Sequence, residues 1–355
     1  MAGSRAKISI DLDALRHNFR QVRRAAPNSK VMAAVKANAY GHGMVKVAQA
    51  LDEADAFAVA TVAEALSLKQ AHIAQPVVIL EGFLDLEELT IALEQDLICV
   101  LHSSYQLELL EKNPPSALKV WVKLDSGMHR LGFPLPEAES VQRRLQRLGG
   151  IEVIGWMSHF SDADDLNNPK NRQQIADFQQ ATQNLSGERS LANSGGILGL
   201  PESHFDWVRP GIMLYGSSPF ADKTAEELNL RPVMRFSARM VTVNHFQKGD
   251  SIGYASSWKC PEDMAVGVVS VGYGDGYPRH AAVGTPLLVK GQKVPLIGRV
   301  SMDMVTVDLR TQPNIKTGDV VMLWGGGLSV DQVASCASTI SYELLCAVTQ
   351  RVERE

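Results

Sequence analysis

Eight short apolar runs, separated by helix-like segments, constrain the fold of the first two thirds of this chain more than any other feature. The runs are VMAAVKA (31–37), AFAVAT (56–61), PVVILEG (76–82), ICVLH (98–102), LKVWVKLD (118–125), EVIGWMSHF (152–160), RSLAN (189–193) and HFDWVRP (204–210). Short buried strands that alternate with amphipathic helices predict a parallel sheet. Eight of them in this length favour a (β/α)8 TIM-like barrel, and an open doubly wound sheet is the alternative that the sequence leaves open.

The pattern changes after about residue 230. Segments such as MRFSARMVTVNHF, MAVGVVSVGYG and MDMVTVDL are rich in β-forming residues, and Gly- or Asp-containing turns separate them. No long helical pattern follows until SVDQVASCAS and SYELLCAVTQRVE near the end of the chain. We therefore expect an α/β barrel domain over residues 1–230 and a mainly antiparallel β domain over residues 231–355, packed together because no low-complexity linker separates them.

Composition and charge exclude several classes of function. Hydrophobic residues make up 45% and charged residues 21% of the 355, as in an ordinary soluble enzyme. A formal net charge of −4 without a Lys/Arg run is unsuited to binding a nucleic-acid backbone. The start of the chain, MAGSRAKISIDLDAL, lacks the apolar core of a signal peptide, and no stretch is long enough to span a bilayer. The four cysteines form no CxxC pair, so we expect reduced thiols, no metal site and a cytoplasmic location.

Chemically capable side chains stand at the ends of five of the eight runs. The carboxyl ends of the strands of a (β/α)8 barrel form one rim, where the reactive groups of barrel enzymes lie. Lys36 lies near the end of the first run, and Lys123 closes the fifth, with Arg130 shortly after it. The polar residues at the ends of the sixth, seventh and eighth runs are His159, Asn193, Ser194 and Arg209. Each alone fits an ordinary turn or cap, but together, on one rim, they favour a site.

Lys36 stands in the stretch AAVKANAYGHG (33–43), where a lone ammonium group follows apolar residues. Such a lysine either reaches solvent at a strand end or is held in a site that uses its amine. The loops NSGG (193–196) and RPGI (209–212) offer backbone N–H groups that are able to hold a phosphate. A phosphate site beside an isolated lysine suggests pyridoxal 5′-phosphate (PLP), with the lysine forming an imine to the cofactor.

Over essentially its whole length the chain resembles the bacterial alanine racemases, which are fold-type III PLP enzymes. The matching motifs are AVKANAYGHG, KLDSGMHRLGF, SHF, NSGGI, WVRPGIMLYG, GYGDGYPR, GRVSMDM and TISYE. The resemblance implies a PLP-binding barrel, a C-terminal β domain and a homodimer in which each β domain completes its partner's active site. It also implies reversible racemisation of alanine by two bases, in an isomerase that supplies D-alanine for peptidoglycan or breaks it down.

The resemblance further implies roles for individual residues. Lys36 resembles the lysine that binds PLP and serves as one base, and Tyr254 in SIGYASSW resembles the second base, contributed by the other subunit. Arg209 matches the arginine that faces the pyridine nitrogen, supported by His159. The residues that the resemblance places around the cofactor phosphate are Tyr40, Asn193, Ser194, Gly211, Ile212 and Tyr342.

Other positions match residues around the substrate. Arg130 resembles the arginine that helps to place the substrate carboxylate, and Lys123 matches a lysine that is carbamylated in some members and then orients that arginine. Met302 and Asp303 would enter from the other subunit, with Met302 at the substrate carboxylate. Tyr273 resembles a gate residue of the entry channel.

Rival interpretations differ at particular residues. Single-barrel PLP carriers lack a β domain such as residues 231–355, and the barrel-plus-β-domain decarboxylases use a glutamate where this chain has Arg209. A broader-specificity amino-acid racemase, acting for example on serine, is the nearest alternative, although those relatives tend to carry an export signal and a disulfide. After Tyr254 the chain reads ASSW, where many relatives have a second glycine and a threonine, so the loop shape and the substrate range stay open.

Overall fold

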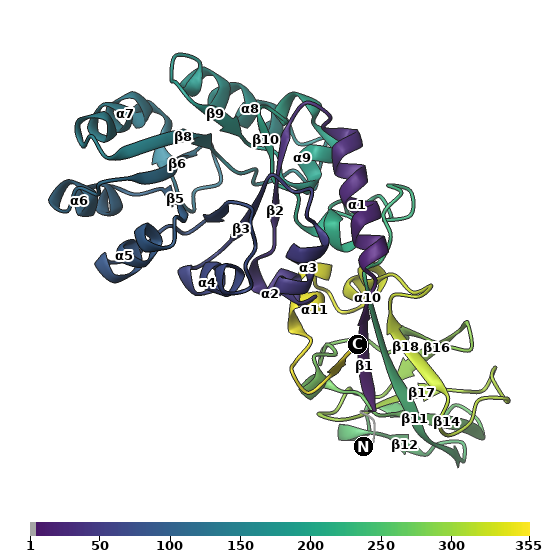
Figure 1. The fold of residues 1–355 in the computed structure, drawn as a ribbon. Coiled ribbons are helices and arrows are strands. Elements are labelled where there is room, and N and C mark those ends of the chain that lie inside the picture. The colour runs from purple at the N-terminus through teal and green to yellow at the C-terminus, as the bar shows by residue number, and fades with distance from the viewer. Residues whose placement is uncertain (1–4) are drawn as a thin grey trace.

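Eight parallel strands close into a barrel in the first two thirds of the chain (Figure 1). The structure is a computed structural model that describes residues 5–355, so residues 1–4, on which the predicted absence of a signal peptide partly rests, lie outside it. In pairing order the strands are β2 (Lys30–Ala34), β3 (Ala56–Val59), β4 (Val77–Ile79), β5 (Ile98–Leu101), β6 (Leu118–Asp125), β8 (Ile151–Met157), β9 (Glu188–Ser190) and β10 (Trp207–Val208). Because β10 pairs again with β2, the sheet is closed. The predicted (β/α)8 barrel is confirmed.

One helix precedes the first barrel strand and the others follow barrel strands, and most of them cover the outside of the barrel (Figure 1). They are α1 (Leu12–Ala25), α2 (Lys36–Tyr40), α3 (Met44–Ala50), α4 (Val62–Gln70), α5 (Leu86–Glu94), α6 (Ser104–Lys112), α7 (Ala138–Arg147), α8 (Pro169–Thr182) and α9 (Ser194–Gly199). Several begin at a side-chain cap, as where Thr61, Asp85 and Ser103 accept hydrogen bonds from the first turns of α4, α5 and α6. None of the helices within residues 5–355 combines the length and apolarity needed to cross a bilayer.

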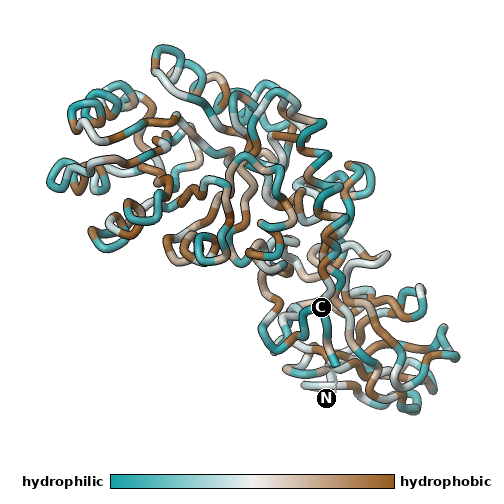
Figure 2. Tube along the Cα trace, in the orientation of Figure 1, coloured by the Kyte–Doolittle hydropathy of each residue, from teal (hydrophilic) through white to brown (hydrophobic). Residues whose placement is uncertain are grey.

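The barrel interior is filled by side chains from alternate strand positions. Met32, Ala58, Val100 and Trp121 belong to a buried cluster inside the ring, while the remaining strand residues pack outward against the helices. This two-sided burial explains why the strands read as continuous apolar runs. Figure 2 shows the same division, with brown segments along the strands and more teal on the peripheral helices.

The β domain is built around a second, smaller closed sheet. Its strands, in pairing order, are β14 (Met264–Val269), β17 (Val305–Asp308), β16 (Gln292–Ile297), β15 (Pro286–Val289), β18 (Val320–Trp324) and β11 (Met234–Phe246). The long strand β11 pairs antiparallel with β18 along its first part and with β14 along its second, which closes the ring. A hairpin of β12 (Ser251–Ile252) and β13 (Trp258–Lys259) projects from this domain, and α10 (Val330–Cys336) and α11 (Ser341–Ala347) return towards the barrel.

The first strand of the chain belongs to this second domain. β1 (Ala6–Ile10) pairs antiparallel with β11 and parallel with the final strand β19 (Glu353–Arg354). The range 1–230 that we predict for the barrel domain therefore contains one strand of the other sheet. The reason is that strand pairing is a long-range choice, which the local alternation of β1 does not reveal.

Candidate active site

A cavity of about 520 Å3 opens at the carboxyl ends of the barrel strands. Eleven of the residues selected from the sequence line it, namely Lys36, Tyr40, Lys123, Arg130, His159, Asn193, Ser194, Arg209, Gly211, Ile212 and Tyr342. Ten of them come from β6 or from the loops and turns that follow β2, β6, β8, β9 and β10, and Tyr342 comes from α11 near the C-terminus. The structure therefore brings together on one rim the polar groups that the sequence places at strand ends.

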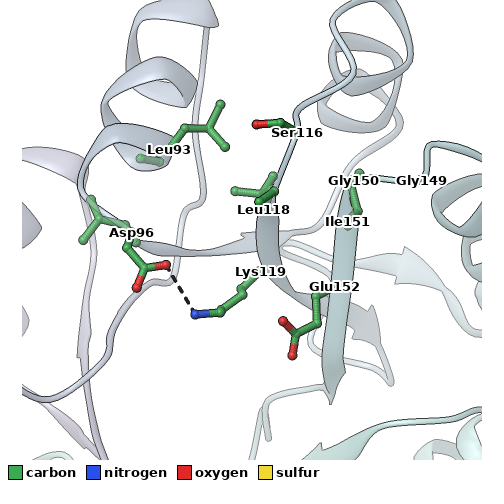
Figure 3. A pocket seen from close by; sticks show the side chains of 12 residues that line it. Leu93, Asp96, Ser116, Leu118, Lys119, Gly149, Gly150, Ile151 and Glu152 are labelled. Carbon is green, nitrogen blue, oxygen red and sulfur yellow. Dashed lines mark hydrogen bonds and ion pairs between the residues drawn. The ribbon is translucent and has the colours of Figure 1, made fainter.

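A second cavity lies at the opposite end of the barrel (Figure 3). It has a volume of about 380 Å3 and lies beside the first residues of β6 and β8. Lys119 forms an ion pair of 3.3 Å with Asp96 there, but the side chains of both residues are substantially exposed, at 45% and 79%. A solvated ion pair at the amino-terminal face of a barrel contributes little and is typical of a structural surface.

Lys36 enters the cavity from a turn of unusual handedness. The four residues after it, Ala37, Asn38, Ala39 and Tyr40, all have φ between 52° and 54°. A left-handed helical conformation costs about 1–2 kcal/mol for each residue other than glycine, so this turn stores several kcal/mol that tertiary contacts must offset. Gly41 and Gly43, with φ of 80° and 97°, complete it where glycine adopts positive φ without steric cost.

Polar contacts hold this turn at both ends. The Glu64 carboxylate accepts hydrogen bonds from the Ala37 N–H and the Ala60 N–H, each at 2.7 Å. Asn38 Oδ1 accepts from the Met44 N–H at 2.9 Å, which ties the turn to the start of α3. The lysine side chain is therefore presented from a rigid, strained segment, as expected at a functional position.

Arg209 is a buried guanidinium with several acceptors. It donates to Ser190 Oγ at 2.6 Å, to the Leu191 carbonyl at 3.3 Å and to the Ser158 carbonyl, and its Nη2 lies 3.2 Å from His159 Nδ1. Burial lowers the pKa of Arg209 to about 10, so the group still carries its charge at neutral pH. Because a guanidinium only donates, His159 Nδ1 acts as the acceptor. Burial, followed by the charge of Arg209, holds the pKa of His159 well below its ordinary value, so this ring is neutral.

A cradle of backbone N–H groups, those of Gly211 and Met213, adjoins the cavity. Ser194 Oγ accepts hydrogen bonds from the Gly211 N–H at 2.9 Å and from the Met213 N–H at 3.3 Å. A Cβ added to Gly211 would lie 2.7 Å from Tyr40 Oη, so a larger residue there would displace the tyrosine hydroxyl. Ser194, Gly211 and Tyr40 thus form one compact group of donors and acceptors around the loops that the sequence selects as phosphate-binding.

Positive charge dominates the cavity. Lys36, Lys123, Arg130 and Arg209 line it, and Glu81 is the one carboxylate among the lining residues that the structure describes. Burial, and then Arg130, lowers the pKa of Lys36. Burial, followed by Arg209, Arg130 and Lys36, lowers the pKa of Lys123 to about 8. Crowding of like charges in a half-buried site disfavours their protonated forms and favours an anionic ligand.

Four of the residues selected from the sequence do not line this cavity. Tyr254, Met302 and Tyr273 lie on the β domain and are exposed, at 69%, 52% and 41%. Asp303, next to Met302, is exposed and pairs with Arg351 at 2.8 Å. Tyr254 lies between β12 and β13, in a hairpin that Figure 1 shows at the end of the β domain remote from the barrel. Within one chain, therefore, these residues and Lys36 are not brought together.

Sequence reasoning missed several residues at the site. Glu81 follows β4 and Cys346 lies in α11, and both line the cavity. Tyr215 and His42 lie behind it, where the Tyr215 ring stacks on Tyr40 at 4.8 Å and on His42 at 4.6 Å between ring centroids. The position of Glu81 just after a strand is a signal that could have identified it, because the carboxyl ends of all barrel strands form the rim where functional groups lie.

Comparison with known proteins decides between the rival interpretations. Residues 10–219 match the family described as "Alanine racemase, N-terminal domain", and residues 233–355 match "Alanine racemase, C-terminal domain". The chain belongs to the alanine racemase family. A curated alanine racemase from Nitrosococcus oceani is 51% identical over 348 residues, which cover 97% of this chain and 97% of the relative.

Solved alanine racemases share the complete two-domain architecture. The biosynthetic alanine racemase from Pseudomonas aeruginosa superposes with a TM-score of 0.97 at 44% identity, over 99% of both chains. The alanine racemase from Bartonella henselae, solved with covalently bound pyridoxal phosphate, superposes with a TM-score of 0.91 at 29% identity, over 99% of both chains. The family assignment therefore rests on both domains and on their arrangement.

Proposed function

We propose that this chain racemises alanine with PLP bound at Lys36. The observation that carries the proposal is the cavity at the barrel rim, in a member of the alanine racemase family. There an amine with a lowered pKa stands among other cationic side chains, beside a cradle of backbone N–H groups. A single-barrel carrier is disfavoured by the β domain, and a decarboxylase by Arg209, which stands where those enzymes have a glutamate.

The residues present fit PLP. Four cationic side chains face one carboxylate in a cavity of about 520 Å3, and a phosphate together with a substrate carboxylate would balance that charge. The phosphate would be held by Tyr40, Asn193, Ser194, Gly211, Ile212 and Tyr342. Arg209, supported by His159, would donate to the pyridine nitrogen and, because it keeps its proton, would not protonate it. When bound at Lys36, PLP supplies an electron sink that makes the Cα proton of alanine removable.

Two bases would act on opposite faces of alanine. Lys36 Nζ is suited to accept a proton because its lowered pKa increases the neutral fraction at working pH. Tyr254 Oη is the second base in the proposal, and it would come from a partner subunit because it is remote from Lys36 within its own chain and exposed. Two fixed bases remove the need for one group to cross the plane of the reacting carbon.

The substrate carboxylate would be placed by Arg130 and by Met302 of a second copy of the chain. The positive charges of Arg209, Arg130 and Lys36 act on Lys123 and, together with burial, lower its pKa to about 8. Part of the Lys123 amine is therefore neutral and able to react with carbon dioxide. The resulting carbamate would carry a negative charge among these cations and would orient Arg130. Asp303 and Tyr273 lie on the same exposed side of the β domain as Met302 and would border the entrance.

We infer that the enzyme is a homodimer that works in the cytoplasm and supplies D-alanine for peptidoglycan. The homodimer is supported by a site that needs residues from two copies. The location is supported by four free cysteines, which persist in reducing compartments. Supply of D-alanine is supported by the structural relative from Pseudomonas aeruginosa, which is described as biosynthetic.

The proposal is tested with PLP-loaded protein and three substrates. L-Alanine, L-serine and L-lysine are incubated separately in deuterated water, and loss of optical rotation and deuterium incorporation at Cα are followed. We expect turnover of alanine alone. Lys36→Ala should lose the covalent link to PLP, so that dialysis removes the cofactor, and should lower turnover by about 10²–10⁴-fold or more.

The matched control is Lys119→Ala, which removes a lysine at the opposite end of the barrel (Figure 3). It should leave both cofactor retention and turnover unchanged. Retention of PLP by the Lys36 variant after dialysis would contradict the assignment of Lys36, and equal turnover of serine would replace alanine racemisation with a broader activity.

A further inference from the structure

His42 is a buried histidine that does not line the active-site cavity. It is 2% exposed and lies two residues beyond Tyr40, directly after the left-handed turn. Its ring nitrogens contact neither Lys36 nor the cradle of backbone N–H groups among the contacts that the structure describes. The proposed reaction therefore leaves this residue without a part.

The imidazole hydrogen-bonds the turn itself. His42 Nδ1 lies 3.0 Å from the Ala39 carbonyl oxygen and 2.9 Å from the Tyr40 carbonyl oxygen. Since carbonyl oxygens only accept, Nδ1 carries the proton and donates to both. Ala39 and Tyr40 are the last two of the four left-handed residues. The Ala39 carbonyl also accepts from the His42 backbone N–H at 3.0 Å, whereas the donor described for the Tyr40 carbonyl is His42 Nδ1.

The imidazole face supports the same turn through a stack of rings. His42 stacks on Tyr215 with 4.6 Å between centroids and 30° between planes, and Tyr215 stacks on Tyr40 at 4.8 Å and 27°. Tyr215 is fixed in turn by its hydroxyl group, which donates to the Ala34 carbonyl at 2.8 Å. The stack ends at the Tyr40 ring, whose hydroxyl group adjoins Gly211.

The other side of the turn is held by the C-terminal part of the chain. Arg354 Nη1 donates to the Gly41 carbonyl at 2.6 Å, and a Cβ on Gly41 would lie 2.2 Å from the Leu345 carbonyl oxygen of α11. The turn is therefore enclosed between His42 and Tyr215 on one side and α11 and Arg354 on the other. A side chain that fixes two carbonyl groups within this enclosure limits how the turn can relax.

The volume that the His42 ring fills does not by itself explain why this position holds a histidine rather than an apolar ring. His42 Nε2 is buried and has no hydrogen-bond partner among residues 5–355. Burial lowers the pKa of His42 to about 4, so the ring is neutral and presents an unpaired acceptor at Nε2. An apolar ring would fill the volume without burying that acceptor, so the benefit of histidine lies in its Nδ1–H.

We infer that His42 is a positioning residue: by donating from Nδ1 to the Ala39 and Tyr40 carbonyl groups it fixes the left-handed turn, and through the turn it sets the directions of Lys36 Nζ and Tyr40 Oη towards PLP. This inference rests on the proposed function, because it concerns the two residues that would bind the cofactor aldehyde and the cofactor phosphate. His42 touches neither cofactor nor substrate, and its effect is on the geometry of groups that do.

The test compares two amides that replace different ring nitrogens. The side-chain nitrogen of asparagine can take the place of His42 Nδ1, whereas that of glutamine takes the place of Nε2. PLP-loaded wild type, His42→Asn and His42→Gln are dialysed against a series of PLP concentrations to obtain dissociation constants. Urea unfolding midpoints of the same preparations report stability, and kcat and KM for alanine are measured separately.

We expect His42→Gln to weaken PLP binding by about 10- to 100-fold and to lower kcat by a similar factor with little change in KM. A misplacement of a reacting group by about 1 Å costs up to about 10²-fold. His42→Asn should recover most of both losses. His42→Phe, which keeps the stacked ring without a donor, should behave as His42→Gln does.

Equal dissociation constants and equal kcat for the Asn and Gln variants would overturn the inference, even if both unfold at lower urea concentration than the wild type. That outcome would assign His42 to stability alone. Wild-type protein that binds no PLP, or exchanges no Cα proton of alanine, would overturn the proposed function together with this inference. Tight binding by the wild type and by every His42 variant would remove the inference and leave the proposed function standing.

Discussion

At the scale of single residues, Lys123 shows how the site shifts a proton equilibrium. Burial and three cationic neighbours bring its pKa from 10.5 to about 8 in the folded chain. The unfolded chain therefore binds this proton more tightly than the folded chain does. Lys123 therefore lowers the free energy of unfolding by its full amount below pH 8, and this destabilisation disappears as the pH rises towards 10.5.

Lys123→Met should consequently stabilise the cofactor-free protein at pH 7. We expect a gain of about 1–2 kcal/mol in the free energy of unfolding, after allowing for partial exposure of the lysine, because the variant removes a charge that its surroundings disfavour. The gain should shrink between pH 8 and pH 10.5, the window between the folded and ordinary values. Urea unfolding in buffer free of carbon dioxide measures it, and a gain that grows with pH would refute the assignment.

Tyr254 gives a second prediction at this scale, which concerns proton exchange on the two opposite faces of alanine. Tyr254→Phe removes one proposed base and leaves Lys36. The exchange of the Cα proton with solvent should fall by about 10²–10⁴-fold for one enantiomer of alanine and much less for the other. Tyr105→Phe, which changes another exposed tyrosine at 59% exposure, is the control. Equal losses for both enantiomers, followed by mass spectrometry in deuterated water, would rule out a two-base mechanism.

At the scale of elements, the left-handed turn of α2 decides where the Lys36 amine, the proposed site of PLP binding, points. The turn holds four residues other than glycine at positive φ, and the contacts from Glu64, Asn38 and His42 offset the strain. A right-handed turn of the same residues would direct Lys36 and Tyr40 differently. We therefore regard α2 as a strained turn that sets the directions of the Lys36 and Tyr40 side chains rather than as an ordinary helix.

Gly41→Ala tests the enclosure of this element. The change places a Cβ 2.2 Å from the Leu345 carbonyl oxygen and also strains a residue at φ 80°. We expect a loss of about 2–5 kcal/mol in the free energy of unfolding. Gly284→Ala is the matched control, because Gly284 has φ 93° and nothing within 4 Å of an added Cβ. It should lose only about 1–2 kcal/mol. Similar losses in the two variants would show that α11 does not confine the turn.

At the scale of the whole molecule, the proposed two-base site is not assembled within one chain. The cavity lies on the barrel, whereas Tyr254 and Met302 lie exposed on the β domain. A symmetric dimer in which each β domain meets the partner's barrel would complete two equal sites at once. It would also cover apolar side chains that a single chain exposes, such as Met302 at 52% and Ile340 at 61%.

Mixing two inactive variants tests this arrangement directly. Lys36→Ala and Tyr254→Phe each damage both sites of their own homodimer. After unfolding and refolding together, random pairing makes half of the dimers mixed, and each mixed dimer has one site with both Lys36 and Tyr254. Activity should recover to about a quarter of the wild-type value. No recovery, with dimers confirmed by sedimentation, would show that the two bases come from one chain.

Much of the architecture follows from local patterns in the sequence. Runs such as ICVLH and LKVWVKLD identify buried parallel strands because both of their faces are covered, and the change of period after about residue 230 marks the β domain. Strand ends in a barrel share one rim, so Lys36, Lys123 and Arg209 could be placed together without knowledge of their side-chain directions. The family assignment rests equally on motifs visible in the sequence.

The sequence by itself determined the class of fold, the order of its strands along the chain and most of the polar residues that meet at the rim. Only the tertiary structure decided that β1 joins the second sheet, that the residues after Lys36 turn left-handed, and that Tyr254 lies away from Lys36 within its own chain. The physical reason is that burial leaves a local period in the sequence, whereas strand partners and strained backbone are fixed by contacts between residues far apart in the chain, such as that of Arg354 with Gly41.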